Sequence, residues 1–138
     1  MNSLTKEIAE ETIKRWAPMM RIADWEIDFA FATELEIKER AKKNGCVAIC
    51  TRNRLLKQAL IELNPQHPDA QADWQRVLAH EMFHVVTDDF QYHADCCLDF
   101  VPEEAHETLL NQLDMYYERM VEDLAAGFVA ALRQVDIP

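Results

Sequence analysis

The sequence predicts an α+β fold in which an N-terminal helix, a small and largely antiparallel sheet of three strands, and two later helices follow one another along the chain. Apolar residues recur at helical spacing near the start of the chain and again through its second half. Between these segments, three short runs have the apolar patterns of strands. With 138 residues, 49% of them apolar, and only 2 glycines, the chain fits one domain spanning residues 1–138.

The first predicted elements are a helix and a strand. Ser3 is the expected N-cap of the helix, and Pro18 together with residues 22–24 marks its end. From residue 25 to residue 32, large apolar side chains then occupy alternate positions. This change of period predicts a strand with one buried face.

Two further strands are predicted at Cys46–Thr51 and Ala59–Leu63, on either side of a polar connection. The charged stretch 34–44 precedes them and leads into Asn44-Gly45, which is a turn signal. Asn64-Pro65 ends the last strand. These runs predict neighbouring antiparallel strands with an exposed, basic hairpin face.

Two long helices are predicted in the second half of the chain. The first is capped by Asp69 and continues to about residue 89, whereas residues 90–100 are expected to form an ordered loop. Pro102 is well placed to begin a last helix that continues to about Arg133 with one broad apolar stripe. We expect these two helices to cover one face of the sheet.

The charge distribution argues against a nucleic-acid partner. The net charge is −11, and residues 64–138 carry most of it, whereas binding to phosphates needs a clustered positive surface. The basic residues between positions 38 and 57 are interrupted by Glu39 and lack interleaved aromatic residues. This pattern favours a solvated surface over a nucleic-acid site.

The sequence also predicts a cytoplasmic protein without a membrane partner. It has no apolar run of the roughly 18 to 20 residues that span a bilayer, and its N-terminus lacks the apolar segment of a signal peptide. The four cysteines are therefore expected to be free thiols in a reducing compartment. A zinc site made with His93 and Cys96 is an alternative that the absence of a CxxC spacing disfavours.

The motif with clear chemical meaning is HEMFH at residues 80–84, an HExxH sequence within the first of the two late helices. Histidines four residues apart project from the same face of a helix, so His80 and His84 can bind one Zn²⁺ ion. Glu81 can reach a water on the metal without being a ligand, and it can act as the general base when that water attacks a carbonyl group. A pair of structural histidines without a metal is the alternative.

Two histidines leave such a site short of a third protein ligand. The HExxHxxGxxH pattern of the metzincins is absent, because Thr87 and Phe90 occupy the positions of its glycine and third histidine. We expect the ligand to be a glutamate of the last helix, and we prefer Glu118, at the margin of the apolar stripe, over Glu122, which lies further toward solvent. Asp88 points one turn beyond the metal, so a surface or capping role is expected for it.

The motif HEMFH is preceded by a helix and a small sheet that ends in LIELNP, and it is followed by a glutamate on a later helix. In these features the chain resembles the compact gluzincin-type zinc metallopeptidases. The chain is similar to the minimal phage- or prophage-encoded metallopeptidases that resemble minigluzincins. The resemblance implies a zincin-like fold, zinc bound by His80, His84 and Glu118, and Glu81 as general base. It also implies that an extended peptide or protein substrate pairs with the strand Ala59–Leu63.

One departure from the gluzincin pattern concerns the ligand helix. Where that pattern has an aspartate four residues after the ligand, this chain has Glu122, with Asp123 beside it. Glu122 can supply the carboxylate that orients a zinc-bound histidine, or it can itself be the ligand after a shift of one turn. Several side chains can stabilise the oxyanion, and the sequence does not choose among them. They are Tyr92, His93, His106, Tyr116 and Tyr117.

These features together predict an intracellular hydrolase that uses Zn²⁺ as cofactor to cleave peptide bonds. Two other interpretations stay open. A latent or inactive zinc-stabilised binding module, such as a phage accessory or regulatory protein, would have the same site without general proteolysis. A structural domain without a metal would follow if HEMFH binds no ion.

Overall fold

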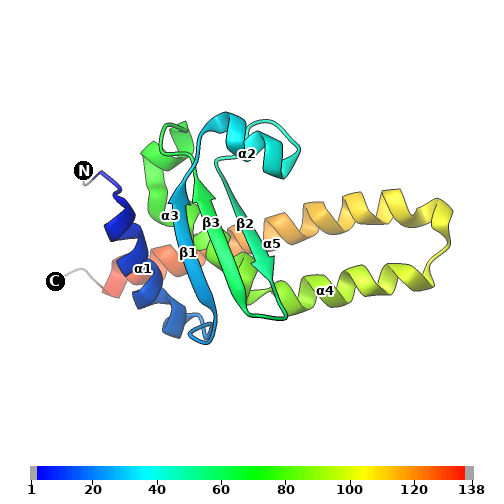
Figure 1. Cartoon of the computed structure of the whole chain (residues 1–138). Helices are drawn as coiled ribbons and strands as arrows, with labels where there is room; N and C mark the ends of the chain where they lie inside the picture. The colour runs from blue at the N-terminus through cyan, green and yellow to red at the C-terminus, as the bar shows by residue number, and fades with distance from the viewer. Residues whose placement is uncertain (1–2, 136–138) are drawn as a thin grey trace.

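The computed structural model describes residues 3–135, so the ends of the predicted domain, residues 1–2 and 136–138, lie outside the described residues. The described chain has an α+β architecture with five α-helices and a three-stranded sheet (Figure 1). In chain order the elements are α1 (Lys6–Met19), β1 (Glu26–Phe31), α2 (Glu34–Ala41), β2 (Ala48–Asn53), β3 (Gln58–Leu63), α3 (Pro68–Val86), α4 (Asp88–Cys97) and α5 (His106–Val135). Short 3₁₀ turns at Leu98–Phe100 and Glu103–Ala105 connect α4 to α5.

The sheet is mixed, which corrects the expectation of a largely antiparallel sheet. Its strand order is β1-β3-β2, with β1 parallel to β3 and β2 antiparallel to β3. After β1 the chain passes through α2 and enters β2 at the far edge, and the β2–β3 hairpin then places β3 between the other two strands (Figure 1). The central strand is therefore the last of the three in the sequence.

The central position of β3 contradicts the expectation, implied by the family resemblance, that substrate pairs with this strand. Residues Ala59–Leu63 are paired with β1 on one side and with β2 on the other. Both rows of backbone hydrogen-bonding groups on β3 are therefore used within the sheet. A peptide cannot add to this strand, and among residues 3–135 the strands with an unpaired edge are β1 and β2.

Two helices begin at caps that differ from the expected residues. Thr5, not Ser3, caps α1, and its hydroxyl accepts a hydrogen bond from the backbone N–H of Ile8 at 3.2 Å. His67, not Asp69, caps α3, and its Nδ1 accepts a hydrogen bond from the backbone N–H of Asp69 at 3.1 Å. In both helices a side chain just outside the first turn satisfies one of the N–H groups that have no intrahelical partner.

The charged stretch 34–44, for which no helix was expected, mostly forms helix α2. Thr33 and Glu36 make a reciprocal capping box at its start. Their T-x-x-E spacing is a sequence signal for a helix start, and sequence reasoning missed it. Arg40 then fastens α2 to the sheet through a 2.8 Å ion pair with Glu62 of β3, a residue that is 5% exposed.

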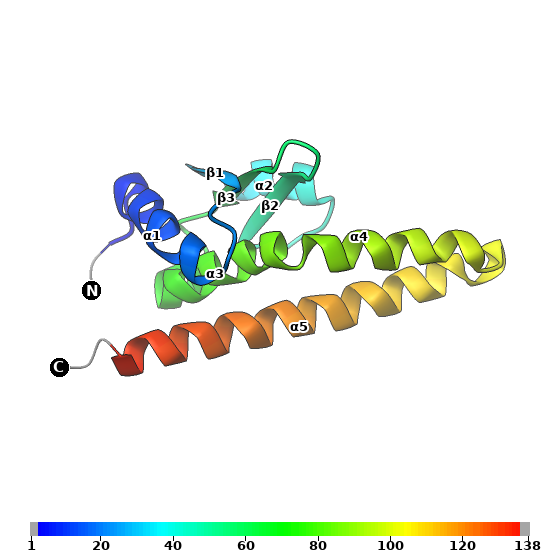
Figure 2. The same ribbon diagram turned by 90° about the horizontal axis from the view of Figure 1, so that it is seen from below.

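Helix α3 lies between the sheet and α5 (Figure 2). It contacts β2 and β3 on one side, and α5 runs antiparallel along its other side. Leu78 and Met82 of α3, together with Val121 and Ala125 of α5, are fully buried in the core. The two long helices thus form successive layers, whereas we expected both of them to cover the sheet directly.

Residues 90–100, expected to form a loop, instead form most of α4 and a short 3₁₀ turn. Helices α4 and α5 make a hairpin that projects from the rest of the domain (Figures 1 and 2). Most side chains of α4 are exposed or half-buried, so this helix shows no clear apolar period in the sequence. Asp88 and Asp89 in its first turn complement the positive end of the helix dipole.

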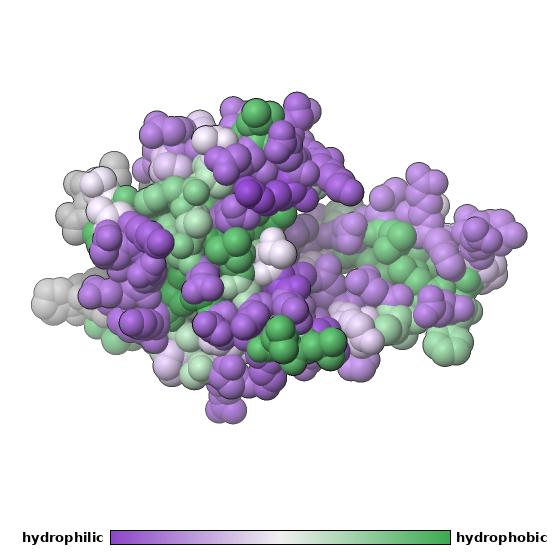
Figure 3. Space-filling model, in the orientation of Figure 1, coloured by the Kyte–Doolittle hydropathy of each residue, from purple (hydrophilic) through white to green (hydrophobic). Residues whose placement is uncertain are grey.

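Hydrophilic residues cover most of the face seen in Figure 3, with apolar patches on the body and on the α4–α5 hairpin. The four cysteines are free, as expected. No helix within residues 3–135 is long and apolar enough to cross a membrane.

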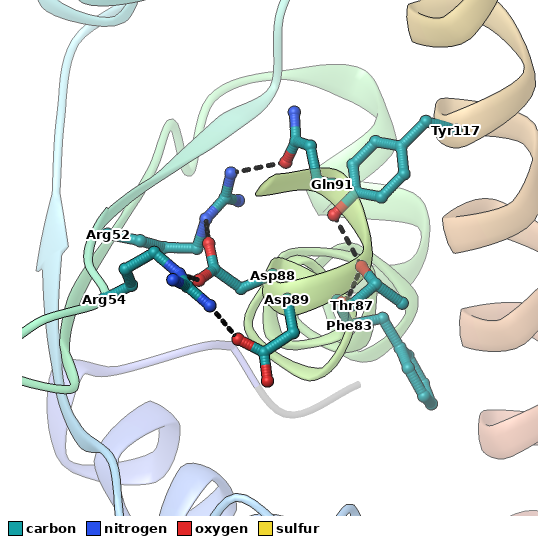
Figure 4. A network of polar contacts seen from close by, with 8 residues as sticks. All are labelled: Arg52, Arg54, Phe83, Thr87, Asp88, Asp89, Gln91 and Tyr117. Atoms are coloured by element: carbon teal, nitrogen blue, oxygen red, sulfur yellow. Dashed lines mark hydrogen bonds and ion pairs between the residues drawn. The ribbon is translucent and has the colours of Figure 1, made fainter. Parts of the chain in front are cut away.

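Asp88 is buried, which corrects the expectation of a surface or capping role. Its carboxylate accepts hydrogen bonds from Nε of Arg52 at 2.9 Å and from Nε of Arg54 at 3.3 Å, so it joins β2 and the following turn to the start of α4 (Figure 4). Arg54 also pairs with Asp89 and lies over the ring of Tyr92, 4.0 Å from its centroid. Because Asp88 is only 8% exposed, water competes little for these contacts.

Replacing Asp88 by alanine should therefore destabilise the protein. The change leaves the guanidinium of Arg52, whose side chain is 18% exposed, without its charged partner. We expect a loss of about 2 kcal/mol in the free energy of unfolding, measured by urea denaturation. Asp89→Ala is the matched control, because that side chain is 83% exposed and its loss should have a much smaller effect. Equal effects of the two substitutions would contradict a structural role for Asp88.

Candidate metal centre

Helix α3 presents a compact group of His80, Glu81 and His84 that could hold a metal ion. One ligand atom from each side chain lies within 4.8 Å of the other two. The group forms because residues four apart in a helix share a face, and Glu81 follows His80 directly. Glu81 and His84 are buried, at 5% and 8% exposure.

Glu118 of α5 faces both histidines. Its Oε2 lies 3.0 Å from Nε2 of His80, and its Oε1 lies 3.3 Å from Nε2 of His84. The structure thus brings together the two histidines and the preferred third ligand of the sequence analysis. Two imidazole nitrogens directed at one carboxylate form a donor set that suits a divalent metal.

Glu122 lies one turn further along α5 and contacts the other nitrogen of His80. Its Oε2 is 2.7 Å from Nδ1 of His80, and its Oε1 also accepts hydrogen bonds from Arg76. Glu122 is thus turned toward the histidine and not simply toward solvent, as its place on the helix had suggested. In this position it can orient the imidazole, as carboxylates commonly do for metal-binding histidines.

The ring of His84 contacts Glu118 through Nε2 and is otherwise held by packing. Its Nδ1 is buried without a hydrogen-bond partner among the described residues. The ring of Tyr117 lies against it, with 5.4 Å between the centroids, and the Tyr117 hydroxyl is 2.5 Å from Oγ1 of Thr87. Figure 4 shows this Tyr117–Thr87 contact. Tyr117 therefore positions the imidazole from the side of α5.

The electrostatics of the group favour a positive charge between its carboxylates and imidazoles. Burial lowers the pKa of His80, but hydrogen bonds with Glu118 and Glu122 and the nearby Glu81 together raise it to about 9. Hydrogen bonds with His80 and His84 hold the pKa of Glu118 well below its usual range. Burial raises the pKa of Glu81, and the two histidines offset part of this effect.

The centre opens into a cleft of about 730 Å³. Residues 45–50, in and before β2, line one wall, and α3 and α5 line the other. Arg52 and Gln91 also line the cleft, and sequence reasoning did not identify either residue. Arg52 occurs in a stretch of basic residues, and Gln91 in the predicted loop, so neither carried a distinctive signal.

Most of the aromatic candidates for oxyanion stabilisation lie away from the centre. Tyr92 contacts His93 and Arg54. His106 makes a hydrogen bond with the carbonyl oxygen of Val101 near the tip of the hairpin. Tyr116 is 59% exposed and does not line the cleft, whereas Tyr117 contacts His84. No metal-ligand group forms around His93 within residues 3–135.

No protein-family model, curated protein or solved structure matches this chain.

Metal titration of single variants should separate the roles of the two glutamates. Glu118→Ala should weaken Zn²⁺ binding more than Glu122→Ala does, because Glu118 faces the Nε2 atoms of both histidines. For Glu122→Ala we expect a loss of affinity of about 10-fold to 100-fold, as is common for groups that orient a metal-bound histidine. The measurement is competition with a chromophoric chelator.

Asp123→Ala is the control for these variants, because it removes an exposed carboxylate that does not line the cleft. Its Zn²⁺ affinity should equal that of the parent protein. If Glu122→Ala weakened binding more than Glu118→Ala, Glu122 would be the ligand.

Proposed function

We propose that this protein is a zinc-dependent metallopeptidase of the gluzincin type. The observation that carries the proposal is the convergence of His80 and His84 from α3 with Glu118 from α5. Two histidines and one glutamate are the protein ligands of a common type of catalytic zinc site, which leaves a coordination position for water or substrate. When bound, zinc would polarise a carbonyl group and lower the pKa of its water.

Glu81 is the proposed general base. It is buried beside both histidines and lines the cleft, so a substrate in the cleft can approach its carboxylate. In this role Glu81 removes a proton from the attacking water and delivers it to the departing amine. Burial and the resulting rise in its pKa favour proton exchange closer to neutral pH than an exposed glutamate allows.

The order of the elements supports a zincin-like arrangement and the similarity to minigluzincin-like phage metallopeptidases. A small sheet precedes the HExxH helix α3, and the long helix α5 adds the glutamate from the far side. Glu122 then has the orienting role for His80 that the family pattern gives to an aspartate. These features extend over most of the described chain.

The proposed substrate is a peptide in extended conformation along the outer edge of β2. This edge replaces Ala59–Leu63, which is fully paired within the sheet. Within residues 3–135, β3 is the one strand that pairs with β2, and residues 45–50 line the cleft beside the candidate metal centre. A peptide at this edge can form backbone hydrogen bonds with β2 while one of its carbonyl groups lies over Glu81.

Glu81→Gln tests the proposed reaction. The variant should retain Zn²⁺ but lose cleavage by about 100-fold to 10,000-fold, which is the usual contribution of a general base. The assay is digestion of a proteome-derived peptide library by the zinc-loaded protein, followed by mass spectrometry. Glu107→Gln, an exposed change in the first turn of α5, is the control and should cleave at the parent rate.

Two outcomes would contradict the proposal. Cleavage by Glu81→Gln at the parent rate would exclude Glu81 as the base. Failure of the fully zinc-loaded parent protein to cleave any peptide would favour the latent zinc-stabilised binding module.

A further inference from the structure

The cleft contains a half-buried cation, Arg52, that the proposed reaction does not use. Arg52 extends from β2 and lines the cleft together with Glu81 and His84. Its side chain is only 18% exposed, which is unusual for arginine without a role in binding or structure. Its hydrogen bonds show which N–H groups of the guanidinium are already paired within the protein.

Two protein groups hold the guanidinium in place and leave donors unused. Nε donates to Asp88 at 2.9 Å and Nη2 donates to Gln91 at 2.7 Å (Figure 4). The guanidinium has five N–H groups, and among residues 3–135 oxygen atoms accept hydrogen bonds from Nε and Nη2 but not from Nη1, while the thiol of Cys50 is a further polar neighbour. Arg52 is therefore fixed in orientation while Nη1 stays available to a ligand.

The charged partner of Arg52 is Asp88, which it shares with Arg54, and the neighbouring thiol of Cys50 adds no negative charge. Cys50 lies two positions earlier on the same face of β2. Burial raises the pKa of its thiol to about 12, the charge of Glu81 adds to this effect, and Arg52 only partly offsets it. The thiol is therefore neutral at physiological pH and only a weak hydrogen-bond acceptor.

Arg52 also differs from the other cations that line the cleft. The difference is exposure: the side chain of Arg76 is 50% exposed and forms an ion pair with Glu122, and Lys43 is also exposed. The guanidinium of Arg52 is thus less exposed to solvent than these two cations. A guanidinium with a fixed orientation favours planar, two-point binding of a carboxylate.

The spacing of residues along β2 indicates how far Arg52 lies from the bond that would be cleaved. Cys50 and Arg52 are separated by about 6.6 Å along the strand, since each residue advances a strand by about 3.3 Å. Both residues line the cleft together with Glu81. A peptide pairing with β2 would therefore present a group near Arg52 about two residues from the carbonyl over Glu81.

We propose that Arg52 is a specificity residue that binds a carboxylate of the substrate within about two residues of the cleaved bond. The inference rests on the proposed peptidase function. A peptide antiparallel to β2 would present an acidic side chain on the N-terminal side of the bond. A peptide parallel to β2 would present an acidic side chain or its own C-terminal carboxylate on the other side.

Cleavage profiles of the same peptide library test the proposal. The zinc-loaded parent should prefer peptides with a carboxylate near the cleaved bond by about 10-fold to 100-fold in kcat/KM, the usual effect of a hydrogen-bonded charge. Arg52→Gln should lose this preference while it still cleaves neutral peptides. The position of the preferred carboxylate identifies it as an acidic side chain or as the peptide C-terminus.

Arg54→Gln is the matched control, because it removes the other arginine that contacts Asp88 without changing a cleft residue. It should retain the parent preference. Arg52→Lys provides a second test if Arg52→Gln does not fold, because it keeps the charge but loses the planar guanidinium, and its preference should be reduced. An unchanged profile in a folded Arg52 variant, or a parent profile without a preference for carboxylates, would overturn the proposal.

A binding measurement distinguishes failure of this proposal from failure of the peptidase function. Acetylated penta-alanine with a free carboxylate, its C-terminal amide, and amidated peptides with a single Glu or Gln would be titrated into zinc-loaded Glu81→Gln protein and followed by NMR. Tighter binding of the carboxylate peptides, abolished by Arg52→Gln, would support the role of Arg52 even if the parent cleaved nothing. Equal binding of each acidic peptide and its neutral analogue would overturn it, whether or not cleavage occurs.

Discussion

The packing of α3 against α5 is the contact on which the rest of the centre depends. Because the two helices run antiparallel and share a period of 3.6 residues, His84 meets Glu118 and, one turn away, His80 meets Glu122. A slip of α5 by one residue would turn both glutamates by about 100° and separate them from the imidazoles. Val121, fully buried between the two glutamates in the sequence, opposes such a slip. Apolar packing and the contacts between the histidines and the glutamates thus depend on the same helix register.

The topology of the sheet determines how the centre can be approached. With β3 in the middle, β2 becomes the edge strand beside α3, and its outer edge faces the cleft instead of another strand. An unpaired edge is a hazard for aggregation in most sheets. Here helix α2 and the turn after it lie beside β2 (Figure 1). The cleft is lined by residues of this segment and of α3. The same edge that must be protected from unwanted pairing is thus the one available for a peptide.

The ion pairs of Asp88 couple the stability of the fold to the shape of the cleft. Asp88 lies where α3 passes into α4, and it holds Arg52 and Arg54 from the β2 side of the domain. Burying such charges has a desolvation cost of several kcal/mol per ion, and apolar residues could connect these elements with less cost. An apolar connection would, however, leave no guanidinium beside Glu81. The polar connection therefore suits the proposed binding of a carboxylate in the cleft.

The sequence by itself determined the elements whose pattern is local. The alternation in β1, the apolar stripe of α5 and the HExxH spacing each depend on neighbours within a few turns or residues, so the histidine pair and the choice of Glu118 followed from periodicity. The T-x-x-E signal of α2 was also local, but it was missed. Only the tertiary structure decided which strand is central, that Glu122 meets His80, and that Asp88 is buried against Arg52. These features depend on contacts between segments far apart in the chain, whose free energies come from shared burial and pairing that no local pattern encodes.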